Sequence, residues 1–593
     1  VKSRASFFSH ESSKRNFRIT NCFKFAWGSA TSAYQTEGAW NVHGKGESIW
    51  DNYSHRAPCW YMRNQTGDVA CDSYHNFDDD LAIIKELGLT HYRFSLSWSR
   101  LFPDGKLTSG PLPDGVRYYN DVINKLIAAN VEPMVTLFHW DLPQALQDEF
   151  GGFNSSKIIL YYVDYADFCF STFGDRIKYW ITFNAPYEYC TQGHGSGTLA
   201  PVSNGTRVTL QDMDSITWIS MTTHRLDKRK DQQNGWLVGE KTQLEYHLYT
   251  LFLCLQNITC ALLNCLDLLQ CFVLNAPLFM FIPLSSEKKQ KQLGRDLMIQ
   301  VHVTMIATNI YGTCCHYSPG EGVYYAAHSI IKSHAQAYHI YNNTYRESQK
   351  GQIGITLNSN WADPMTRTDL EHVEASQRNL AFATGWFADP IFGTGDYPDI
   401  MRYNVQNISE FFNITHDRLP KFTEAEKLLN KGTSDFFGLN HYTSHLVVPC
   451  SYYQNLDGPT YDSDQVWLIS LMGISNNLTS TWLYQVPWGI RKLLIWIKRT
   501  YGDPVIYITE NGISEHFSDG LDDDIRVNYY KNYINEVLKA IKEDDVNVKG
   551  YTAWSLMDNF EWAEGYSERF GLHWVNFTDP ERTRIPKKSA SYY

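Results

Sequence analysis

Several classes of protein are excluded by what the sequence does not contain. It has no basic tract, and its net charge is −12, which argues against a nucleic-acid-binding role. Its 12 cysteines include no metal-type Cys-x-x-Cys pair, which leaves disulfides or inert buried thiols as their roles. The first residue, Val1, is not an initiating Met, and no charged and then apolar signal segment follows it. We therefore expect both ends of the chain to be truncated.

Charge and periodic patterning are also scarce in one long segment, residues 202–318. Its middle, residues 247–284, contains a single formal charge and is long enough to span a bilayer. Any membrane contact is confined to this stretch, although several of its polar residues would be costly in lipid. Three interpretations stay open: a lid, a membrane-touching insertion, or non-coding sequence in a faulty gene model. The patternless composition favours the third. The polar residues are Gln256, Asn257, Asn264, Asp267 and Gln270.

Glycosylation sequons are plentiful by contrast. Chance alone supplies several Asn-X-Ser/Thr sites in a chain of 593 residues, and this chain has more. The excess predicts a protein of the secretory pathway, either extracellular or lumenal. The sites are Asn52, Asn64, Asn154, Asn204, Asn257, Asn342, Asn407, Asn413, Asn477 and Asn576.

The rest of the chain is rich in aromatic residues and in short apolar runs. Aromatic residues make up 15% of the sequence, which suits a large core or a pocket with flat apolar walls, such as sugar sites use. Eight short runs are apolar on both faces, as expected of strands that are covered on both sides. These runs are residues 25–34, 91–98, 132–140, 179–184, 351–358, 435–442, 505–512 and 550–558.

Helical patterns separate most of these runs. Apolar residues recur at helical spacing, and acidic residues that favour helix starts precede two of the segments, at Asp114 and at Asp522 to Asp524. Eight strand–helix alternations predict one α/β domain, a single (β/α)8 TIM barrel, although a chain of this length would by default hold two or more domains. The barrel is expected over residues 17–593, interrupted by the insertion at 202–318 after the fourth strand, with an N-terminal tail at 1–16.

Polar residues gather at the C-terminal ends of the predicted strands. That end is where (β/α)8 enzymes assemble their sites, because eight loops converge there. One such residue would be typical of any loop, but five at equivalent positions indicate a functional site. They are His139, Asn184, Asn440, Tyr442 and Glu510.

Seven motifs in this order resemble glycoside hydrolase family one, and within it the β-glucosidase and lactase-phlorizin hydrolase type of animals, to which klotho proteins also belong. The motifs are TSAYQTEGAW, HYRFSLSW, LFHWDLPQAL, WITFNAP, FFGLNHYTS, YITENG and WSLMDNFEWAEGYSERFGL. The resemblance covers about 17–201 and 319–593. It implies a β-glycoside substrate, either a small molecule or an oligosaccharide, and hydrolysis that retains the anomeric configuration without a cofactor or a metal.

Retaining hydrolysis needs two carboxyl groups about 5–5.5 Å apart, one as nucleophile and one as general acid and base. The resemblance assigns the nucleophile to Glu510, and Arg93 and Tyr442 match the positions that contact it. A carboxylate that directly follows an apolar strand needs such partners to stay ionised. The alternative is an ordinary loop carboxylate.

Sugar binding needs several polar groups from different strands. Gln35, His139, Asn184 and Glu561 match the family positions that bind the glycone, the sugar on the non-reducing side of the bond. Alone, His139 would be typical of a satisfied buried histidine, but its agreement with the other three favours binding. Three tryptophans match further substrate positions: Trp554 and Trp562 as flat faces for the sugar ring, and, by a weaker resemblance, Trp361 on the aglycone side.

The second carboxylate is missing. Where the family has Thr-Phe-Asn-Glu-Pro, this chain has Ala185 between Asn184 and Pro186, and a methyl group cannot transfer a proton. General acid–base help contributes roughly 10²–10⁴ in rate. Glu188 follows three residues later, a displacement of several ångströms, so the sequence favours an ordinary loop carboxylate over a substitute.

Three functions therefore stay open. The first is a β-glycosidase that is impaired or restricted to good leaving groups. The second is a catalytically silent sugar- or protein-binding module of the klotho kind. The third is an enzyme like the plant thioglucosidases, which lack the acid/base Glu and act on an aglycone that departs unaided. The retained Glu510, with Arg93 and Tyr442, favours catalysis.

Overall fold

The computed structural model describes residues 25–56, 64–202, 320–450, 458–470, 480, 482–516 and 520–593. The predicted N-terminal tail at 1–16, the apolar stretch 247–284 and all but the first residue of the predicted insertion lie outside these described residues. Their assignments stay predictions. No helix in the described part of the chain combines the length and the apolar character that a membrane crossing requires.

Eight parallel strands close into a barrel, and each lies beside its neighbours in chain order. The ring closes where the first strand, β1, pairs with the last, β12, from Ala26↔Gly550 to Ala30↔Trp554. All eight strands coincide with the apolar runs in the sequence, which confirms the predicted (β/α)8 fold. The strands are β1 (Ala26–Ala30), β2 (His91–Ser95), β3 (Glu132–Phe138), β4 (Tyr179–Asn184), β5 (Gln352–Asn358), β7 (Phe437–Asn440), β10 (Ile506–Asn511) and β12 (Val548–Trp554).

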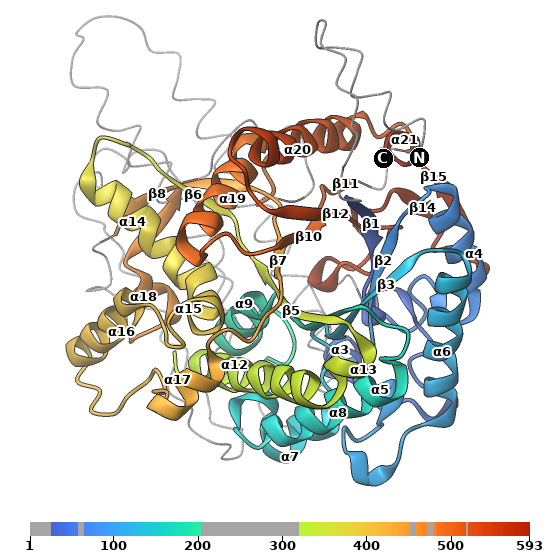
Figure 1. Ribbon diagram of the computed structural model, residues 1–593, viewed down its shortest axis with the longest axis horizontal. Coiled ribbons are helices and arrows are strands. Elements are labelled where there is room, and N and C mark those ends of the chain that lie inside the picture. Colours follow the sequence, from blue (N-terminus) through green and yellow to red (C-terminus); the bar gives the residue numbers. More distant parts are fainter. Residues whose placement is uncertain are drawn as a thin grey trace, which may run out of the picture. The chain divides into compact units, whose positions relative to one another are not determined.

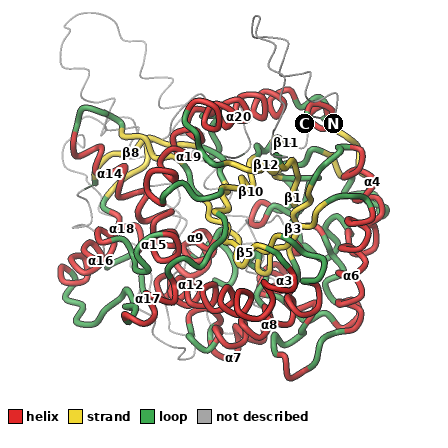
Figure 2. The backbone as a smooth tube through the Cα atoms, in the orientation of Figure 1, coloured by secondary structure: helices red, strands yellow, loops and turns green. Residues whose placement is uncertain are grey.

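Helices surround the ring of strands (Figures 1 and 2), which explains why the strands are apolar on both faces. Helix α6 begins at Pro113, slightly before the predicted start, because proline is well suited to the first helical position. Helix α20 begins at Asp524, as the acidic run predicts. The longer helices are α4 (Ser73–Glu86), α6 (Pro113–Ala128), α8 (Ile158–Phe173), α12 (Gly322–Ile340), α14 (Leu370–Leu380), α16 (Asp399–Phe411), α19 (Pro487–Tyr501) and α20 (Asp524–Glu543).

Side chains fill the inside of the barrel. Met134, Ile181, Phe436 and Tyr507 form a buried cluster that is separate from the main core. The rings of Tyr179 on β4 and Tyr507 on β10 lie 5.5 Å apart, although two other strands separate β4 from β10 in the ring. This contact therefore crosses the interior, which is packed and is not a pore.

Shorter elements lie in the loops between the barrel strands and after the last of them. A three-stranded sheet of β6 (Trp361–Pro364), β8 (Ser444–Pro449) and β9 (Trp467–Ser470) lies outside the ring, with β6 and β8 beside α14 (Figure 1). Two small sheets pair β11 (Glu515–His516) with β13 (Glu568–Arg569) and β14 (His573–Val575) with β15 (Arg584–Pro586). The short helices are α2 (Ala33–Thr36), α3 (Ile49–Arg56), α5 (Trp98–Leu101), α7 (Gln144–Phe150), α9 (Pro186–Glu188), α13 (Arg346–Gln349), α15 (Trp386–Phe392), α17 (Glu424–Asn430), α18 (Tyr461–Gln465) and α21 (Lys588–Tyr592).

Candidate active site

The barrel brings polar side chains from distant parts of the chain to one end. Strand register places Asn358, Asn440 and Glu510 in one row at the C-terminal ends of β5, β7 and β10. Asn184 is the last residue of β4, and His139 directly follows β3. The predicted gathering of polar groups at this end is therefore real, and it follows from parallel strands that all end at the same edge.

Glu510 is held at both of its carboxylate oxygens. Arg93 Nη1 donates to Oε1 at 2.5 Å, and the Tyr442 hydroxyl donates to Oε2 at 2.6 Å. The Arg93 side chain is fully buried in the middle of β2, so its positive charge balances that of the carboxylate where water is excluded. Burial, and then the charge of Glu510, raises the pKa of Tyr442, which keeps the phenol a donor.

Asn184 joins this ion pair to His139. Arg93 Nη2 donates to Asn184 Oδ1 at 2.7 Å, and the amide of Asn440 donates to the same oxygen at 2.9 Å. Asn184 Nδ2 then donates to His139 Nε2 at 3.0 Å. Burial, and then the positive charge of Arg93, lowers the pKa of His139 well below its usual value, so its ring is neutral and can accept this bond.

Aromatic rings enclose His139. The rings of Trp554 and Trp562 each stack on it with centroids 5.9 Å away. Trp140 lies 4.7 Å from Trp562, and its indole N–H donates to the backbone oxygen of Asn184 at 3.0 Å. These flat apolar surfaces suit the C–H face of a sugar ring.

Gln35 and Glu561 come together from opposite ends of the chain. Gln35, in the short helix after β1, donates from Nε2 to Asn559 Oδ1 at 3.0 Å and to Glu561 Oε2 at 3.4 Å. Burial, and then the charges of Glu568 and Glu510, raises the pKa of Glu561 well above its usual value. A neutral carboxyl can both donate to and accept from a sugar hydroxyl.

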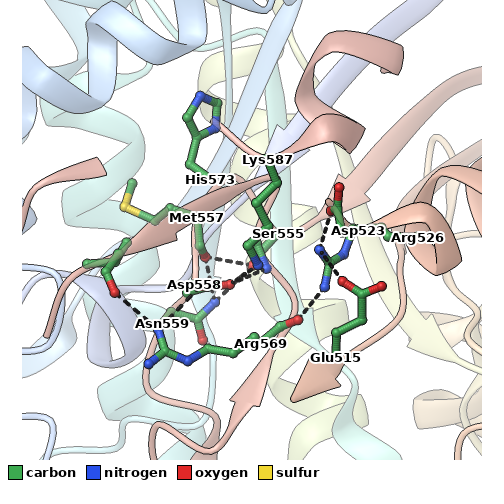
Figure 3. Close-up of polar contacts among 12 residues, drawn as sticks. Glu515, Asp523, Arg526, Ser555, Met557, Asp558, Asn559, Arg569, His573 and Lys587 are labelled. Atoms are coloured by element: carbon green, nitrogen blue, oxygen red, sulfur yellow. Dashed lines mark hydrogen bonds and ion pairs between the residues drawn. The ribbon is translucent and has the colours of Figure 1, made fainter. Parts of the chain in front are cut away.

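A buried ionic network anchors the loop that carries Glu561 and Trp562. Asp558 pairs with Lys587 Nζ at 2.7 Å and with Arg569 at 3.3 Å, and Asn559 Nδ2 donates to Ser555 Oγ at 3.0 Å (Figure 3). Burial, and then the charge of nearby Arg526, lowers the pKa of Lys587 to about 8. Because each charge in the pair is buried, loss of either partner would leave the other unbalanced.

The end of β4 differs from the rest of the site. Ala185 has a left-handed backbone (φ 41°, ψ 57°), and its N–H donates to Thr356 O at 2.9 Å. Glu188 ends α9, where its Oε1 accepts a hydrogen bond from Asn358 Nδ2. This carboxyl thus belongs to a short helix and is bound to β5, its Oε2 is shielded from solvent, and burial raises its pKa to about 8. Whether it is an ordinary carboxylate or a substitute stays a prediction.

One predicted site residue lies apart from the others. Trp361 begins β6, where its indole N–H donates to Asp363 at 2.9 Å and Lys492 Nζ lies 5.7 Å from its ring. These contacts do not join it to the group around Glu510. Its predicted aglycone role stays a prediction.

Three residues that complete the site were not predicted from the sequence. The signal was present, because each is adjacent to, or within two residues of, a motif residue or at a predicted strand end. They are Trp140, Asn358 and Asn559. In the described residues no cluster of three or more His, Cys, Asp or Glu could hold a metal ion.

Comparisons with known proteins agree with this geometry. The chain is 38% identical to human lactase/phlorizin hydrolase over 96% of its length and spans 23% of that relative. It is 38% identical to human lactase-like protein, spanning 80% of it, and 37% identical to human cytosolic β-glucosidase, with 96% of both proteins covered.

Solved structures of the same kind superpose on the chain. Aphid myrosinase has a TM-score of 0.73 at 34% identity, covering 96% of this chain and 97% of that one. A mutant rice β-glucosidase in a covalent complex with Glc has a TM-score of 0.72 at 31% identity, with the same coverage. The model of the family described as glycosyl hydrolase family 1 matches residues 19–234 and 298–593. A closed parallel barrel with this match over most of its length places the chain in glycosyl hydrolase family 1.

Proposed function

We propose that the chain is a retaining β-glycosidase of the β-glucosidase type whose nucleophile is Glu510. The observation that carries the proposal is the hold on both oxygens of this carboxylate by Arg93 and Tyr442. A binding module has no need of a buried, charge-balanced carboxylate beside a sugar site. Gln35, His139, Asn184 and Glu561 complete the site as the glycone set, the groups that bind the sugar.

The reaction proceeds in two displacements. A carboxylate oxygen of Glu510 attacks the anomeric carbon, the bond to the aglycone oxygen breaks, and its electron pair leaves with that oxygen. Water then attacks the anomeric carbon of the glycosyl ester and loses a proton to the solvent, and the electron pair of the ester bond returns to Glu510. Two inversions leave the configuration of the sugar unchanged.

The proposed substrates carry good leaving groups. Ala185 occupies the position of the acid/base Glu of the family, and its methyl group supplies no proton to the departing oxygen. The missing help amounts to about 10²–10⁴ in rate for a poor leaving group, but to little for an aglycone that departs as a stable anion. Thioglucosides with activated aglycones meet the same condition.

Trapping of the intermediate tests the nucleophile. A 2-deoxy-2-fluoro glucoside with a dinitrophenolate leaving group should label the protein, and mass spectrometry of the peptide YITENG should place the sugar on Glu510. An unlabelled peptide would overturn the proposal. If such a protein still bound glucose, the function would be that of a sugar-binding module.

Restoring the carboxyl group tests the restriction. Ala185→Glu should raise the turnover of alkyl glucosides by about 10²–10⁴, with little change for dinitrophenyl glucosides. Glu347→Gln, on the exposed face of α13, is a control that should change neither rate. Equal rates in the parent protein and in Ala185→Glu would contradict the restriction.

We further propose a secretory or lumenal location. The exposure of the sequon residues Asn64, Asn342 and Asn407 supports it, because a glycan needs an accessible asparagine. Loss of mass on treatment with a peptide N-glycosidase tests this location, and a protein without glycans after expression in secretory cells would contradict it.

A further inference from the structure

Asn358 faces the interior of the site. Two residues earlier on β5, Thr356 donates from Oγ1 to Thr509 Oγ1 at 3.2 Å, across a neighbouring strand. Alternate residues of a strand point to the same side, so the side chain of Asn358 points inward as well. Its register partner Asn440 is in turn the register partner of Glu510. Asn358 therefore lies in the same row as the nucleophile.

The carboxyl group of Glu188 is attached to this inward-facing side chain. Its Oε1 accepts from Asn358 Nδ2, whereas Oε2 is shielded from solvent and has no hydrogen-bond partner among the described residues. A buried carboxyl oxygen without a partner is unusual in a folded protein, because the missing bond costs about 1–3 kcal/mol. A water molecule bound beside Oε2 would supply the missing bond.

The electrostatic surroundings of Glu188 are those of a proton donor. Burial raises its pKa to about 8, the hydrogen bond from Asn358 opposes the rise, and the charge of Glu510 adds to it. The other titratable groups that interact with it are Tyr187 and Cys190, whose own pKa values burial raises, so both are neutral. The raised pKa therefore favours the protonated form of Glu188 at neutral pH.

We propose that Glu188 is the general acid and base of this site and acts through one water molecule in place of the side chain that is missing at position 185. The inference rests on the proposed function, because it needs Glu510 as the nucleophile. A relay is part of the proposal because Glu188 follows position 185 by three residues and its carboxyl is held by Asn358, whose backbone lies two strand spacings, about 10 Å, from that of Glu510. Direct transfer in a retaining glycosidase uses carboxyl groups about 5–5.5 Å apart.

The proton then moves in a closed cycle. As Glu510 attacks and the glycosidic bond breaks, Glu188 gives its proton to the relay water, which passes a proton to the departing aglycone oxygen. In the second step the Glu188 carboxylate takes a proton, through the relay, from the water that attacks the glycosyl ester. The sugar and the aglycone leave with the elements of one water, and both carboxyl groups return to their first state.

The two carboxyl groups also regulate each other. Esterification removes the negative charge of Glu510, and with it the part of the pKa rise of Glu188 that this charge causes. Glu188 is thus more fully protonated in the first step and more readily ionised in the second. This change follows from the like charge and requires no movement of the chain.

Glu188→Gln tests the inference, because the amide keeps the size and the bond from Asn358 but loses the proton. In the parent protein it should slow hydrolysis of a phenyl glucoside by about 10²-fold, the lower end of the range for acid–base help. It should also abolish the loss of rate near pH 8 that we expect of the parent. Azide, a nucleophile that needs no base, should accelerate the variant and give β-glucosyl azide.

The same substitution in the Ala185→Glu background provides the matched control. There the new carboxyl takes over the proton transfer, so Glu188→Gln should change the rate by less than about 3-fold, a non-additivity that a purely structural role would not give. Equal effects in both backgrounds, or a parent pH profile unchanged by Glu188→Gln, would overturn the inference.

The outcomes separate this inference from the proposed function. If the fluorinated glucoside labels Glu510 in both the parent and Glu188→Gln, both proteins are folded and the nucleophile is assigned. The rates then decide on Glu188 alone. If neither is labelled, and Ala185→Glu is not labelled either, the proposed function fails and the inference fails with it.

Discussion

Two walls of the site contain glutamates in contrasting environments. The nucleophile wall consists of Arg93, Tyr442 and Glu510, and there both carboxylate oxygens have donors and one donor is a cation. The opposite wall consists of Ala185, Glu188 and Asn358, and there the carboxyl has one amide donor and one buried oxygen without a partner among the described residues. The same side chain is therefore prepared for two different tasks by its neighbours alone.

The physical reason for the difference is charge balance. Removing a carboxylate from water is offset on the nucleophile wall by the buried guanidinium of Arg93. At Glu188 burial is opposed only by neutral donors, the Asn358 amide and a backbone N–H, so the pKa rises to about 8. A nucleophile must be ionised and a general acid must not be, so the two walls need opposite environments.

The largest effect is expected from replacing the nucleophile itself. Glu510→Gln keeps the size of the side chain but cannot form the glycosyl ester, so turnover of a dinitrophenyl glucoside should fall by about 10⁴-fold or more. Steady-state release of dinitrophenol measures this turnover. Glu347→Gln, the same substitution at an exposed position, is the control. A variant that keeps a tenth of the parent rate would show that Glu510 is not the nucleophile.

A smaller effect should follow from the loss of one hydrogen bond to the nucleophile. Tyr442→Phe removes the donor to Glu510 Oε2, and a hydrogen bond to a charged group contributes about 1.5–3 kcal/mol, or roughly 10–100-fold in rate. Stopped-flow measurement of the dinitrophenol burst gives the rate of the first displacement. Phe at 442 should still pack, so an unchanged melting temperature is the control. A burst rate equal to that of the parent would contradict the role of this bond.

The smallest effect concerns stability at the opposite wall. Between pH 4.5 and 8 the unfolded chain ionises Glu188 while the folded protein keeps the proton, so burial of this group lowers the free energy of unfolding increasingly as pH rises. Glu188→Gln removes this dependence. Relative to the parent, the variant should be more stable at pH 7.5 than at pH 4.5 by about 1–3 kcal/mol.

Chemical denaturation at the two pH values measures this difference. Glu347→Gln makes the same Glu-to-Gln change at an exposed position, so its stability relative to the parent should be the same at both pH values. A Glu188→Gln variant that behaves like this control would show that the carboxyl is ionised and solvated, and would remove the contrast between the two walls.

The eight strands and the end of the barrel at which the site lies were both predictable. Strands covered on both faces are apolar throughout, so each one can be recognised in the sequence. A polar residue at the C-terminal end of such a strand lies at the end of the barrel that holds the site, so Glu510 and Asn184 could be placed from their neighbours in the chain. The extra sheets and the ionic network around Asp558 were not predictable. The strands are two to six residues long, too short for a periodic pattern, and the charges pair with residues outside their own element.

Local patterning was thus sufficient for the barrel, for the candidate nucleophile and for the absence of a carboxylate at position 185, because each depends on residues that are adjacent in the chain. The environment of each side chain depended on folding. The sequence predicted Glu188 as an ordinary loop carboxylate, and closure of the barrel instead put it against Asn358, 170 residues away. Burial and charge act through space, so the pKa of a carboxyl is set by the groups that folding brings around it.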